Sequence, residues 1–214
     1  MAGTLQENVV EILRKYWGDK PLREHKALVI GYGTIGSRLA EALFSKGISV
    51  AVFDSDEMKQ MEADMSKHFQ VLTNLNDLSS FTVIIGTSGE TSLKGPEFWG
   101  LSHNVILISG SSEKVEFDLE ALRAGAKKVE IEDIFTKYIL VKDNKVVRVV
   151  LDGEPVNFAL SEGISNAVID PVYAEMFLGA LQLVTGSGLE NGVLELPKDT
   201  EARIYELYKA YHRR

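Results

Sequence analysis

The feature that most constrains this chain is a glycine-rich turn between a short apolar run and a segment with helical periodicity. Residues 27–31 read Ala-Leu-Val-Ile-Gly, which predicts a buried strand, and residues 35–46 carry apolar side chains on one helical face. At this junction Gly31, Gly33 and Gly36 fit the pattern G-x-G-x-x-G. Gly31 permits a tight turn, Gly33 lets the backbone approach a pyrophosphate, and Gly36 lets the helix pack on the strand. The alternative is that these glycines only turn a strand into a helix.

Apolar strands and helices alternate along the chain. Further strands are expected at 48–53, 70–72, 82–85 and 105–108, and helices at 4–16, 35–46, 56–67, 118–124, 166–184 and 200–211. The stretch 138–151 instead alternates β-branched and polar residues, which predicts a hairpin. Continuous apolar strands between helices are typical of a parallel sheet covered on both faces. We therefore expect an α/β fold, namely a doubly wound, Rossmann-like, mostly parallel sheet with a late β-hairpin and terminal helices.

Asp54 supplies a second signal for a dinucleotide site. It ends the expected strand 48–53 and lies about twenty residues beyond the glycines, where an acid accepts hydrogen bonds from the adenosine ribose. Its charge would repel a 2′-phosphate, and Ser55, Asp56 and Glu57 bring no arginine to neutralise one. The sequence therefore predicts NAD rather than NADP as the cofactor. The alternative role for Asp54 is that of a helix N-cap.

Two later segments are candidates for the far side of the cofactor crevice. Residues 86–89 read Gly-Thr-Ser-Gly and residues 109–112 read Ser-Gly-Ser-Ser, each directly after an expected strand. Such small, hydroxyl-bearing loops suit close backbone contact with a ribose or nicotinamide, and the candidates are Thr87, Ser88, Gly89, Ser109 and Gly110. Each segment taken singly is also what an ordinary turn contains.

Composition excludes several classes of function. Asp and Glu number 31 against 23 Lys and Arg, a formal charge of −8, which disfavours binding to nucleic acid. Cysteine is absent, so disulfides, thiolate metal sites and cysteine nucleophiles are excluded, and none of the four histidines has metal-ligand spacing. No apolar run approaches the roughly 20 residues of a membrane-spanning helix, and the first residues do not resemble a signal peptide. We expect a cytoplasmic protein that binds neither membrane nor metal.

Together these motifs resemble the NAD-binding domain of the S-adenosylhomocysteine hydrolase family. The resemblance rests on the glycine turn at 31–36, Asp54, residues 86–89 and 108–110, and Val115-Glu-Phe-Asp118. It continues through Gly153-Glu-Pro-Val-Asn157 and Gly163 to Gly192-Val-Leu-Glu-Leu-Pro197, in matching order over residues 26–211. It implies a tightly held NAD that is reduced and reoxidised within each cycle, while the adenosine 3′-hydroxyl is oxidised and the 5′-thioether is eliminated.

The resemblance also places residues around the cofactor. It implies Thr34 and Ile35 under the pyrophosphate, Asp54 at the adenosine ribose, Thr87 and Gly110 near the nicotinamide half, and Asn157 at the nicotinamide amide. The sequence thus predicts a single NAD-binding domain over residues 1–214, with a leading helix and linker at 1–25, a Rossmann core at 26–186 and a helical tail at 187–214.

The chain departs from the family at several catalytic positions. Only a short helix stands where the family carries its substrate domain, and Ser111 and Ile164 stand where the family has histidines. The family's C-terminal lysine and tyrosine have no counterpart in this sequence. We therefore expect an NAD-binding protein without complete hydrolase activity, which acts as a redox sensor, a regulatory subunit or a partner-dependent component. A fragment of a larger hydrolase is a further alternative.

A second functional hypothesis is a small NAD-dependent dehydrogenase acting on an alcohol or nucleoside. Hydride transfer needs an oriented nicotinamide, a proton acceptor and a pocket. The candidate acceptors are Glu113, Glu162 and His103, although each is also of a type that lies solvated at a surface.

The expected helix 166–184 carries apolar residues over a wide surface. Such a surface exceeds what one sheet face usually covers, which indicates a subunit contact. The resemblance implies the same, since this helix lies at a subunit interface in the family. We expect a homo-oligomer, a dimer through this helix, although core packing would also explain the pattern.

Overall fold

The computed structural model describes residues 2–18, 20–158, 166–186, 192 and 195–212. Contacts within the chain divide it into two compact units, Met1–Ser161 and Glu162–Arg214. The expected single domain over residues 1–214 stays a prediction.

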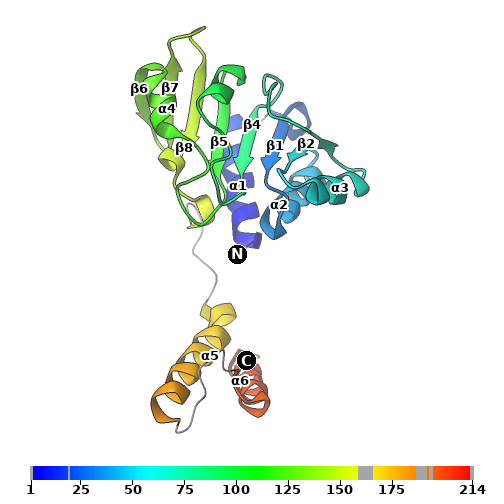
Figure 1. Cartoon of the computed structure of the whole chain (residues 1–214), viewed down its shortest axis with the longest axis vertical. Helices are drawn as coiled ribbons and strands as arrows, with labels where there is room; N and C mark the ends of the chain where they lie inside the picture. The colour runs from blue at the N-terminus through cyan, green and yellow to red at the C-terminus, as the bar shows by residue number, and fades with distance from the viewer. Residues whose placement is uncertain (1, 19, 159–165, 187–191, 193–194, 213–214) are drawn as a thin grey trace. The chain divides into compact units, whose positions relative to one another are not determined.

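The first unit is built on an eight-stranded sheet in the order β3-β2-β1-β4-β5-β8-β7-β6 (Figure 1). Its strands are β1 (Lys26–Ile30), β2 (Ser49–Phe53), β3 (Gln70–Val71), β4 (Val83–Gly86), β5 (Val105–Ser109), β6 (Ala126–Glu132), β7 (Phe135–Leu140) and β8 (Val146–Val150). Strands β1 to β5 pair in parallel and β8 joins β5 in parallel, whereas β7 is antiparallel to both β8 and β6. The predicted mostly parallel, doubly wound sheet with a late hairpin is confirmed.

The strand order contains a switch point between β1 and β4. From β1 the chain first adds β2 and β3 on one side and then returns to add β4 and β5 on the other. In sheets of this type ligands bind outside the carboxyl ends of the strands at such a point. The carboxyl ends of β1, β2, β4 and β5 therefore define where a site is expected.

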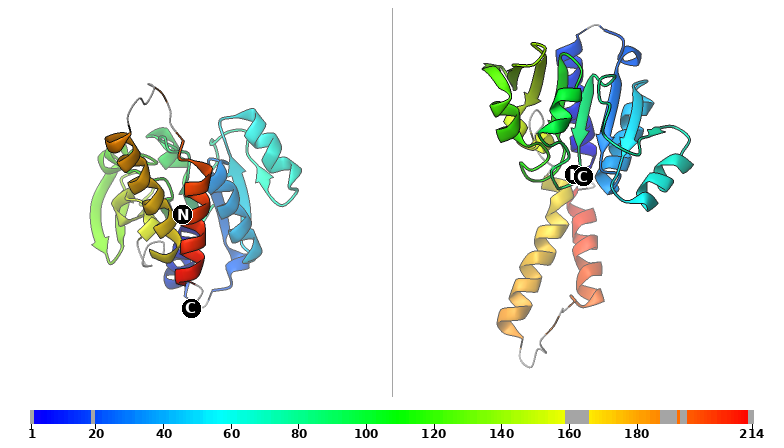
Figure 2. Two further views of the ribbon diagram at one scale, coloured as in Figure 1. Left: turned by 90° about the horizontal axis from the view of Figure 1, so that it is seen from below. Right: turned by 45° about the horizontal axis from the view of Figure 1, so that its top comes forward.

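Helices cover both faces of the sheet (Figures 1 and 2). The helices of this unit are α1 (Ala2–Trp17), α2 (Thr34–Ser45), α3 (Glu57–Met65) and α4 (Leu119–Ala124), with short 3-10 helices η1 (Leu22–Glu24), η2 (Pro96–Gly100), η3 (Leu151–Gly153) and η4 (Val156–Phe158). Leu13 of α1 and Leu39 of α2 lie in the same buried cluster as Val29 of β1. Leu28 of the same strand points into a second cluster with Phe98 and Leu122. Because successive side chains of β1 enter different cores, the strand is buried on both faces, as its continuous apolar sequence predicts.

Strand β6 is a feature that the sequence analysis missed. Residues 126–132 read Ala-Lys-Lys-Val-Glu-Ile-Glu, and all but Ala126 and Glu130 are exposed. Val129 and Ile131 alternate with charged residues as in a strand, but only these two apolar residues form the pattern and both are exposed, so the segment does not stand out as a buried strand. The predicted single hairpin is in fact a three-stranded antiparallel extension of the sheet.

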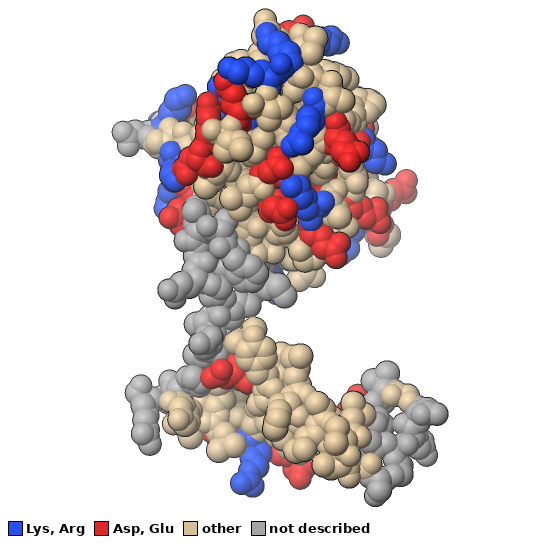
Figure 3. All heavy atoms as spheres, turned by 90° about the vertical axis from the view of Figure 1, so that its left-hand side faces the viewer, with Lys and Arg blue, Asp and Glu red and all other residues tan. Residues whose placement is uncertain are grey.

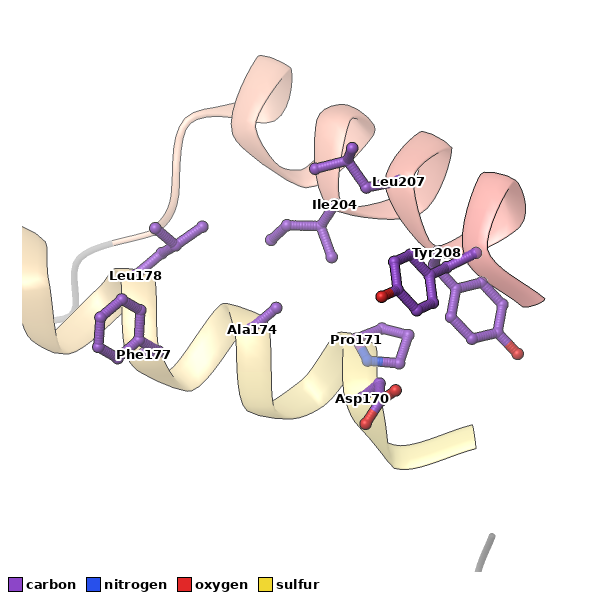
Figure 4. A pocket seen from close by; sticks show the side chains of 9 residues that line it. Asp170, Pro171, Ala174, Phe177, Leu178, Ile204, Leu207 and Tyr208 are labelled. Atoms are coloured by element: carbon purple, nitrogen blue, oxygen red, sulfur yellow. The ribbon is translucent and has the colours of Figure 1, made fainter. Parts of the chain in front are cut away.

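The second unit contains α5 (Asn166–Thr185) and α6 (Lys198–His212), which pack together. Ile204 of α6 is buried and faces α5, on the side of α5 where Pro171 and Ala174 lie (Figure 4). Between the helices lies a hollow of about 460 Å³ with a largely apolar lining: Asp170, Pro171, Ala174, Phe177, Leu178, Ile204, Leu207, Tyr208 and Tyr211. Within the described residues, no helix combines the length and apolarity needed to cross a membrane.

Candidate functional site

The turn between β1 and α2 has a backbone that only glycine can adopt at its first position. Gly31 has φ +96°, and its N–H donates to the carbonyl oxygen of Phe53 at 2.8 Å. A Cβ added at Gly31 would lie 2.8 Å from the backbone nitrogen of Ser88. Both the dihedral angle and the close approach of the loop after β4 therefore require glycine here.

Gly36 brings α2 close to the end of β1. A Cβ at this position would overlap the carbonyl oxygen of Gly31 and would lie 2.6 Å from Oγ1 of Thr87. The third glycine of the pattern thus serves helix–strand packing, as the sequence predicts.

Gly33, in contrast, faces open space. It is the N-cap of α2, no side chain caps the helix, and a Cβ at Gly33 would meet no atom within 4 Å. Gly33 and Thr34 are exposed and Ile35 is half-buried. The first N–H groups of an α-helix have no partner within the helix, and the helix dipole favours an anion beside them. This end of α2 therefore fits a pyrophosphate.

Asp54 lies beside this turn at the carboxyl end of β2. Its Oδ2 accepts a hydrogen bond from the backbone N–H of Tyr32 at 2.5 Å, and its Oδ1 accepts one from Asp56 at 2.9 Å. A carboxylate oxygen has a second lone pair, so the half-buried Asp54 retains the capacity to accept hydroxyl donors. The alternative role as an N-cap is wrong, because Asp56 caps α3 by accepting a hydrogen bond from Met58.

Thr87 connects the two strands at the switch point. Its hydroxyl lies 3.1 Å from the carbonyl oxygen of Ile30 and 2.9 Å from that of Gly31, and it donates to these acceptors. Its backbone N–H also donates to Ile30 at 2.8 Å. Thr87 therefore fixes the glycine turn from the side of β4.

Glu116 is a component of this region that the sequence analysis left unassigned. The residue is only 1% exposed. Its carboxylate accepts hydrogen bonds from the backbone N–H of Gly89 at 2.8 Å, from the Ser88 hydroxyl at 3.0 Å and from the Ser92 hydroxyl. Glu116 also packs against Gly86, where any Cβ would overlap its side chain. This buried acid shapes the loop after β4, and its partners lie 24 to 28 residues earlier, so no local sequence pattern indicates its role.

The loop after β5 lies against the same edge. Gly110 fits closely, since a Cβ there would lie 2.9 Å from Cγ2 of Thr87 and 3.2 Å from Leu5 of α1. Ser109 is buried, and its hydroxyl lies 3.3 Å from that of Ser111. Asn157 donates from Nδ2 to the carbonyl oxygen of Ser111 at 3.3 Å. The structure thus brings Thr87, Ser109, Gly110 and Asn157 to one edge of the sheet.

The backbone that precedes Asn157 is held by a contact from α1 and has an unusual conformation. Asn8 of α1, which is fully buried, donates from Nδ2 to the carbonyl oxygen of Val156 at 2.7 Å. Upstream, Leu151, Asp152 and Gly153 all have positive φ values of +49°, +51° and +83°. Left-handed conformations at non-glycine residues are uncommon and need support from their surroundings.

Asp152 receives that support from polar partners. Its carboxylate accepts hydrogen bonds from the hydroxyl of Tyr138 at 2.9 Å and from Lys114 at 3.1 Å. Although partial burial acts to raise it, these hydrogen bonds leave the pKa of Asp152 below its ordinary value. Burial, followed by the Asp152 hydrogen bond, raises the pKa of Tyr138. The strained turn before Asn157 is therefore held by a charged carboxylate.

The three candidate proton acceptors lie in different places. Glu113 is exposed on the loop after β5, and its carbonyl oxygen accepts a hydrogen bond from the Ser111 hydroxyl at 2.8 Å. His103 precedes β5, so it lies at the amino edge of the sheet, opposite the glycine turn, and its Nδ1 accepts from the Val146 N–H at 3.4 Å. The structure therefore does not bring His103 together with the cofactor residues. Glu162 lies outside the described residues.

Within the described part of the chain no three His, Asp or Glu side chains cluster as metal ligands.

A glycine turn at a helix N-terminus, an acid fixed beside it, and a switch point between β1 and β4 define the chain as an NAD-binding protein of the Rossmann class. Residues 5–163 match the family described as "S-adenosyl-L-homocysteine hydrolase, NAD binding domain". The chain belongs to this family.

Curated relatives agree with this assignment. The adenosylhomocysteinase of Nostoc sp. is 29% identical over 182 residues, which cover 84% of this chain and 43% of the relative. The S-inosyl-L-homocysteine hydrolase of Methanopyrus kandleri is 28% identical over 183 residues, with coverage of 84% and 43%. The chain therefore spans less than half the length of these relatives.

Solved structures share the fold at low sequence identity. A dipicolinate synthase protein from Bacillus halodurans matches with a TM-score of 0.52 and 15% identity, covering 57% of this chain and 43% of that one. A D-lactate dehydrogenase from Sporolactobacillus sp. matches with a TM-score of 0.54 and 13% identity, covering 91% and 68%. These likenesses show the Rossmann-like fold.

Proposed function

We propose that this chain holds NAD and has no complete hydrolase activity by itself, so that it acts as a redox sensor, a regulatory subunit or a component that requires a partner. The observation that carries the proposal is the pairing of an intact cofactor cradle with Ser111. By resemblance this position holds a histidine in the family. The Ser111 hydroxyl donates to a carbonyl oxygen and cannot replace an imidazole as a proton acceptor near pH 7.

The chain's own residues fit each part of the cofactor. In this proposal the N-terminus of α2 at Gly33, Thr34 and Ile35 binds the pyrophosphate, and Asp54 accepts hydrogen bonds from the adenosine ribose. The loops after β4 and β5 line the nicotinamide half through Thr87, Ser88, Gly89, Ser109 and Gly110, with Asn157 at the amide. When bound, NAD supplies a hydride acceptor at its nicotinamide.

Native mass spectrometry of the purified protein tests this proposal. We expect each protomer to carry the additional mass of one NAD, or to acquire it when NAD is added. The same preparation is expected to release no homocysteine from S-adenosyl-L-homocysteine. If no nucleotide is bound and calorimetry at millimolar NAD shows no heat of binding, the proposed function is wrong. Efficient turnover by the chain alone would contradict the second half of the proposal.

A second candidate function is an NAD-dependent dehydrogenase acting on an alcohol or nucleoside, and the position of Glu113 favours it. Of the two candidate acceptors that the structure describes, only Glu113 lies at the carboxyl ends of the parallel strands, where the cofactor is proposed to bind. If this hypothesis is correct, Glu113→Gln lowers the rate of NADH formation on an active substrate by about a hundredfold. The matched control is Glu120→Gln, an exposed acid on α4. Equal rates for parent, variant and control would exclude Glu113 as the acceptor.

We also propose a homo-oligomer, in the simplest case a dimer, formed through the helix at 166–184. In the second unit, Val172, Met176, Phe177 and Val184 of α5 are each about half exposed or more. An α-helix that is apolar around most of its circumference needs cover on more than one side. The assembly mass in the same native spectra measures the number of protomers. The cytoplasmic location expected from the sequence remains part of this proposal.

A further inference from the structure

Strand β6 forms one edge of the eight-stranded sheet. In the described part of the chain, β6 pairs with β7 on one side and with no strand on the other. Val129 is 40% exposed and Ile131 is 83% exposed. Figure 3 views the molecule from the side on which β6 lies in Figure 1, and there basic and acidic side chains are interspersed over the first unit. The pairing of β6 with β7 is irregular between Ala126 and Lys128, so the regular free edge covers residues 128–132, and such an edge is a template for pairing with another strand.

The turn between β6 and β7 fixes which backbone groups of β6 point outward. Two residues, Asp133 and Ile134, separate the paired residues Glu132 and Phe135. In a hairpin with such a short connection the pair beside the turn is hydrogen-bonded, and hydrogen-bonded and non-hydrogen-bonded pairs then alternate. Glu132, Glu130 and Lys128 therefore direct their backbone groups to β7. Val129 and Ile131 direct their N–H and C=O groups to the free edge.

The charges along this edge are arranged so that β6 complements itself. Two basic residues, Lys127 and Lys128, precede Val129, and Glu130 and Glu132 follow it. If two copies of β6 pair antiparallel about a two-fold axis at Val129, Lys128 lies opposite Glu130 of the second copy, and the reverse pair forms by symmetry. Opposite charges facing each other across strands are stabilising, whereas like charges are destabilising.

Neighbouring registers place like charges opposite each other. Moving the axis to Glu130 pairs Lys128 with Glu132 of the second copy but places the two Glu130 side chains opposite each other, and moving it to Lys128 places two lysines opposite each other. An axis between two residues pairs outward backbone groups with inward ones, so the ladder cannot form. Among these registers, the one centred on Val129 therefore aligns outward backbone groups with each other and opposes no like charges. In that register Val129 lies opposite its own copy, with Ile131 diagonal to it on the same face of the sheet.

We propose that β6 is an interface for a second copy of this chain, and that the two sheets join edge to edge through antiparallel β6 strands centred on Val129. This contact is independent of NAD binding and of the contact through α5. A protein that uses both contacts forms assemblies larger than dimers.

Cysteine cross-linking in the full-length chain tests the register. Because the chain contains no cysteine, a single introduced thiol gives an unambiguous product. Val129→Cys is expected to form a disulfide-linked dimer under mild oxidation, since opposed residues of antiparallel strands have Cα atoms about 5.5 Å apart. Ile131→Cys is the matched control, because Ile131 lies on the same edge and is more exposed. Its copy would be four residues away along the partner strand, about 13 Å, so no dimer is expected.

Charge exchange supplies a second, independent measurement. Lys128→Glu and Glu130→Lys each create like-charge pairs across the two-fold axis, so each variant alone is expected to associate about tenfold more weakly than the parent. An equimolar mixture of the two variants restores both complementary pairs and is expected to form the heterodimer. Because Glu130 also forms ion pairs with Lys128 and Lys137 of its own chain, the thermal unfolding midpoint of each variant is measured as well, and a midpoint close to that of the parent shows that the hairpin remains folded.

The outcomes separate this inference from the others. Lack of a disulfide-linked dimer with Val129→Cys, or equal linkage with Ile131→Cys, overturns the β6 interface. Failure of the variant mixture to associate overturns it as well. A dimer of Val129→Cys that forms no disulfide indicates association through another surface and likewise overturns the β6 interface. If the parent chain does not bind NAD, the proposed function is wrong, but the result of the cross-linking experiment is unaffected.

Discussion

Gly33→Ala is expected to weaken NAD binding about a hundredfold, which corresponds to about 2.7 kcal/mol, while the free energy of unfolding changes by less than about 1 kcal/mol. The added methyl group meets no protein atom within 4 Å, and the backbone at Gly33 has an ordinary φ of −74°. The methyl group would instead occupy the space in which the pyrophosphate approaches the helix N-terminus. Calorimetric titration with NAD and chemical denaturation without NAD measure the two quantities separately.

Substitutions at two other glycines serve as comparisons for Gly33→Ala. Gly36→Ala places a methyl group on the carbonyl oxygen of Gly31, so it is expected to lower the free energy of unfolding by about 3 kcal/mol and to weaken NAD binding as well. Gly95→Ala is the neutral control, because its Cβ would make an ordinary 3.5 Å contact with Ala121. If Gly33→Ala binds NAD as the parent does, the pyrophosphate does not lie on this turn.

Asp54→Ala is expected to weaken NAD binding by two to three orders of magnitude, about 3 to 4 kcal/mol, and to lower the free energy of unfolding by about 2 kcal/mol. The loss of binding follows from removal of the acceptor for the ribose hydroxyls. The loss of stability follows from the two backbone N–H groups, of Tyr32 and Asp56, that lose a charged acceptor. Because the carboxylate would also repel a 2′-phosphate, the ratio of NAD to NADP affinity is expected to fall in the variant.

Asp56→Ala is the matched control for this experiment. Asp56 caps α3 through Met58 and has no predicted contact with the cofactor. It is expected to lower the free energy of unfolding by about 1 kcal/mol and to leave the preference for NAD unchanged. An equal effect of both substitutions on NAD affinity would mean that Asp54 acts only through the fold.

The sequence predicted the parts of the site that depend on local backbone geometry. Gly31 and Gly36 are required by a positive φ and by close packing, and these requirements leave a pattern that can be read from spacing alone. Asp54 could be found because the end of β2 is brought beside the turn in every sheet of this type. The binding roles of these residues stay predictions.

Other parts depend on contacts between distant segments. The buried carboxylate of Glu116 binds Gly89, which lies 27 residues earlier, and no local pattern distinguishes it from a surface acid. His103, a candidate proton acceptor, lies away from the glycine turn, since a residue that precedes a parallel strand lies at the amino end of that strand. Strand β6 was not predicted because its alternating pattern contains only two apolar residues, Val129 and Ile131, and neither is buried in a core.

The hydrogen bond from Asn8 to Val156 joins residues 148 positions apart. During synthesis α1 emerges before the acceptor for its buried amide and before strand β8, which pairs with β5. Long-range closures of this kind slow folding, because the chain must lose loop entropy before the contact forms. In the proposed binding mode Asn157 contacts the nicotinamide amide, so this part of the site is completed only after residue 157 has been synthesised, and the nascent chain gains no stabilisation from the nucleotide there before this point.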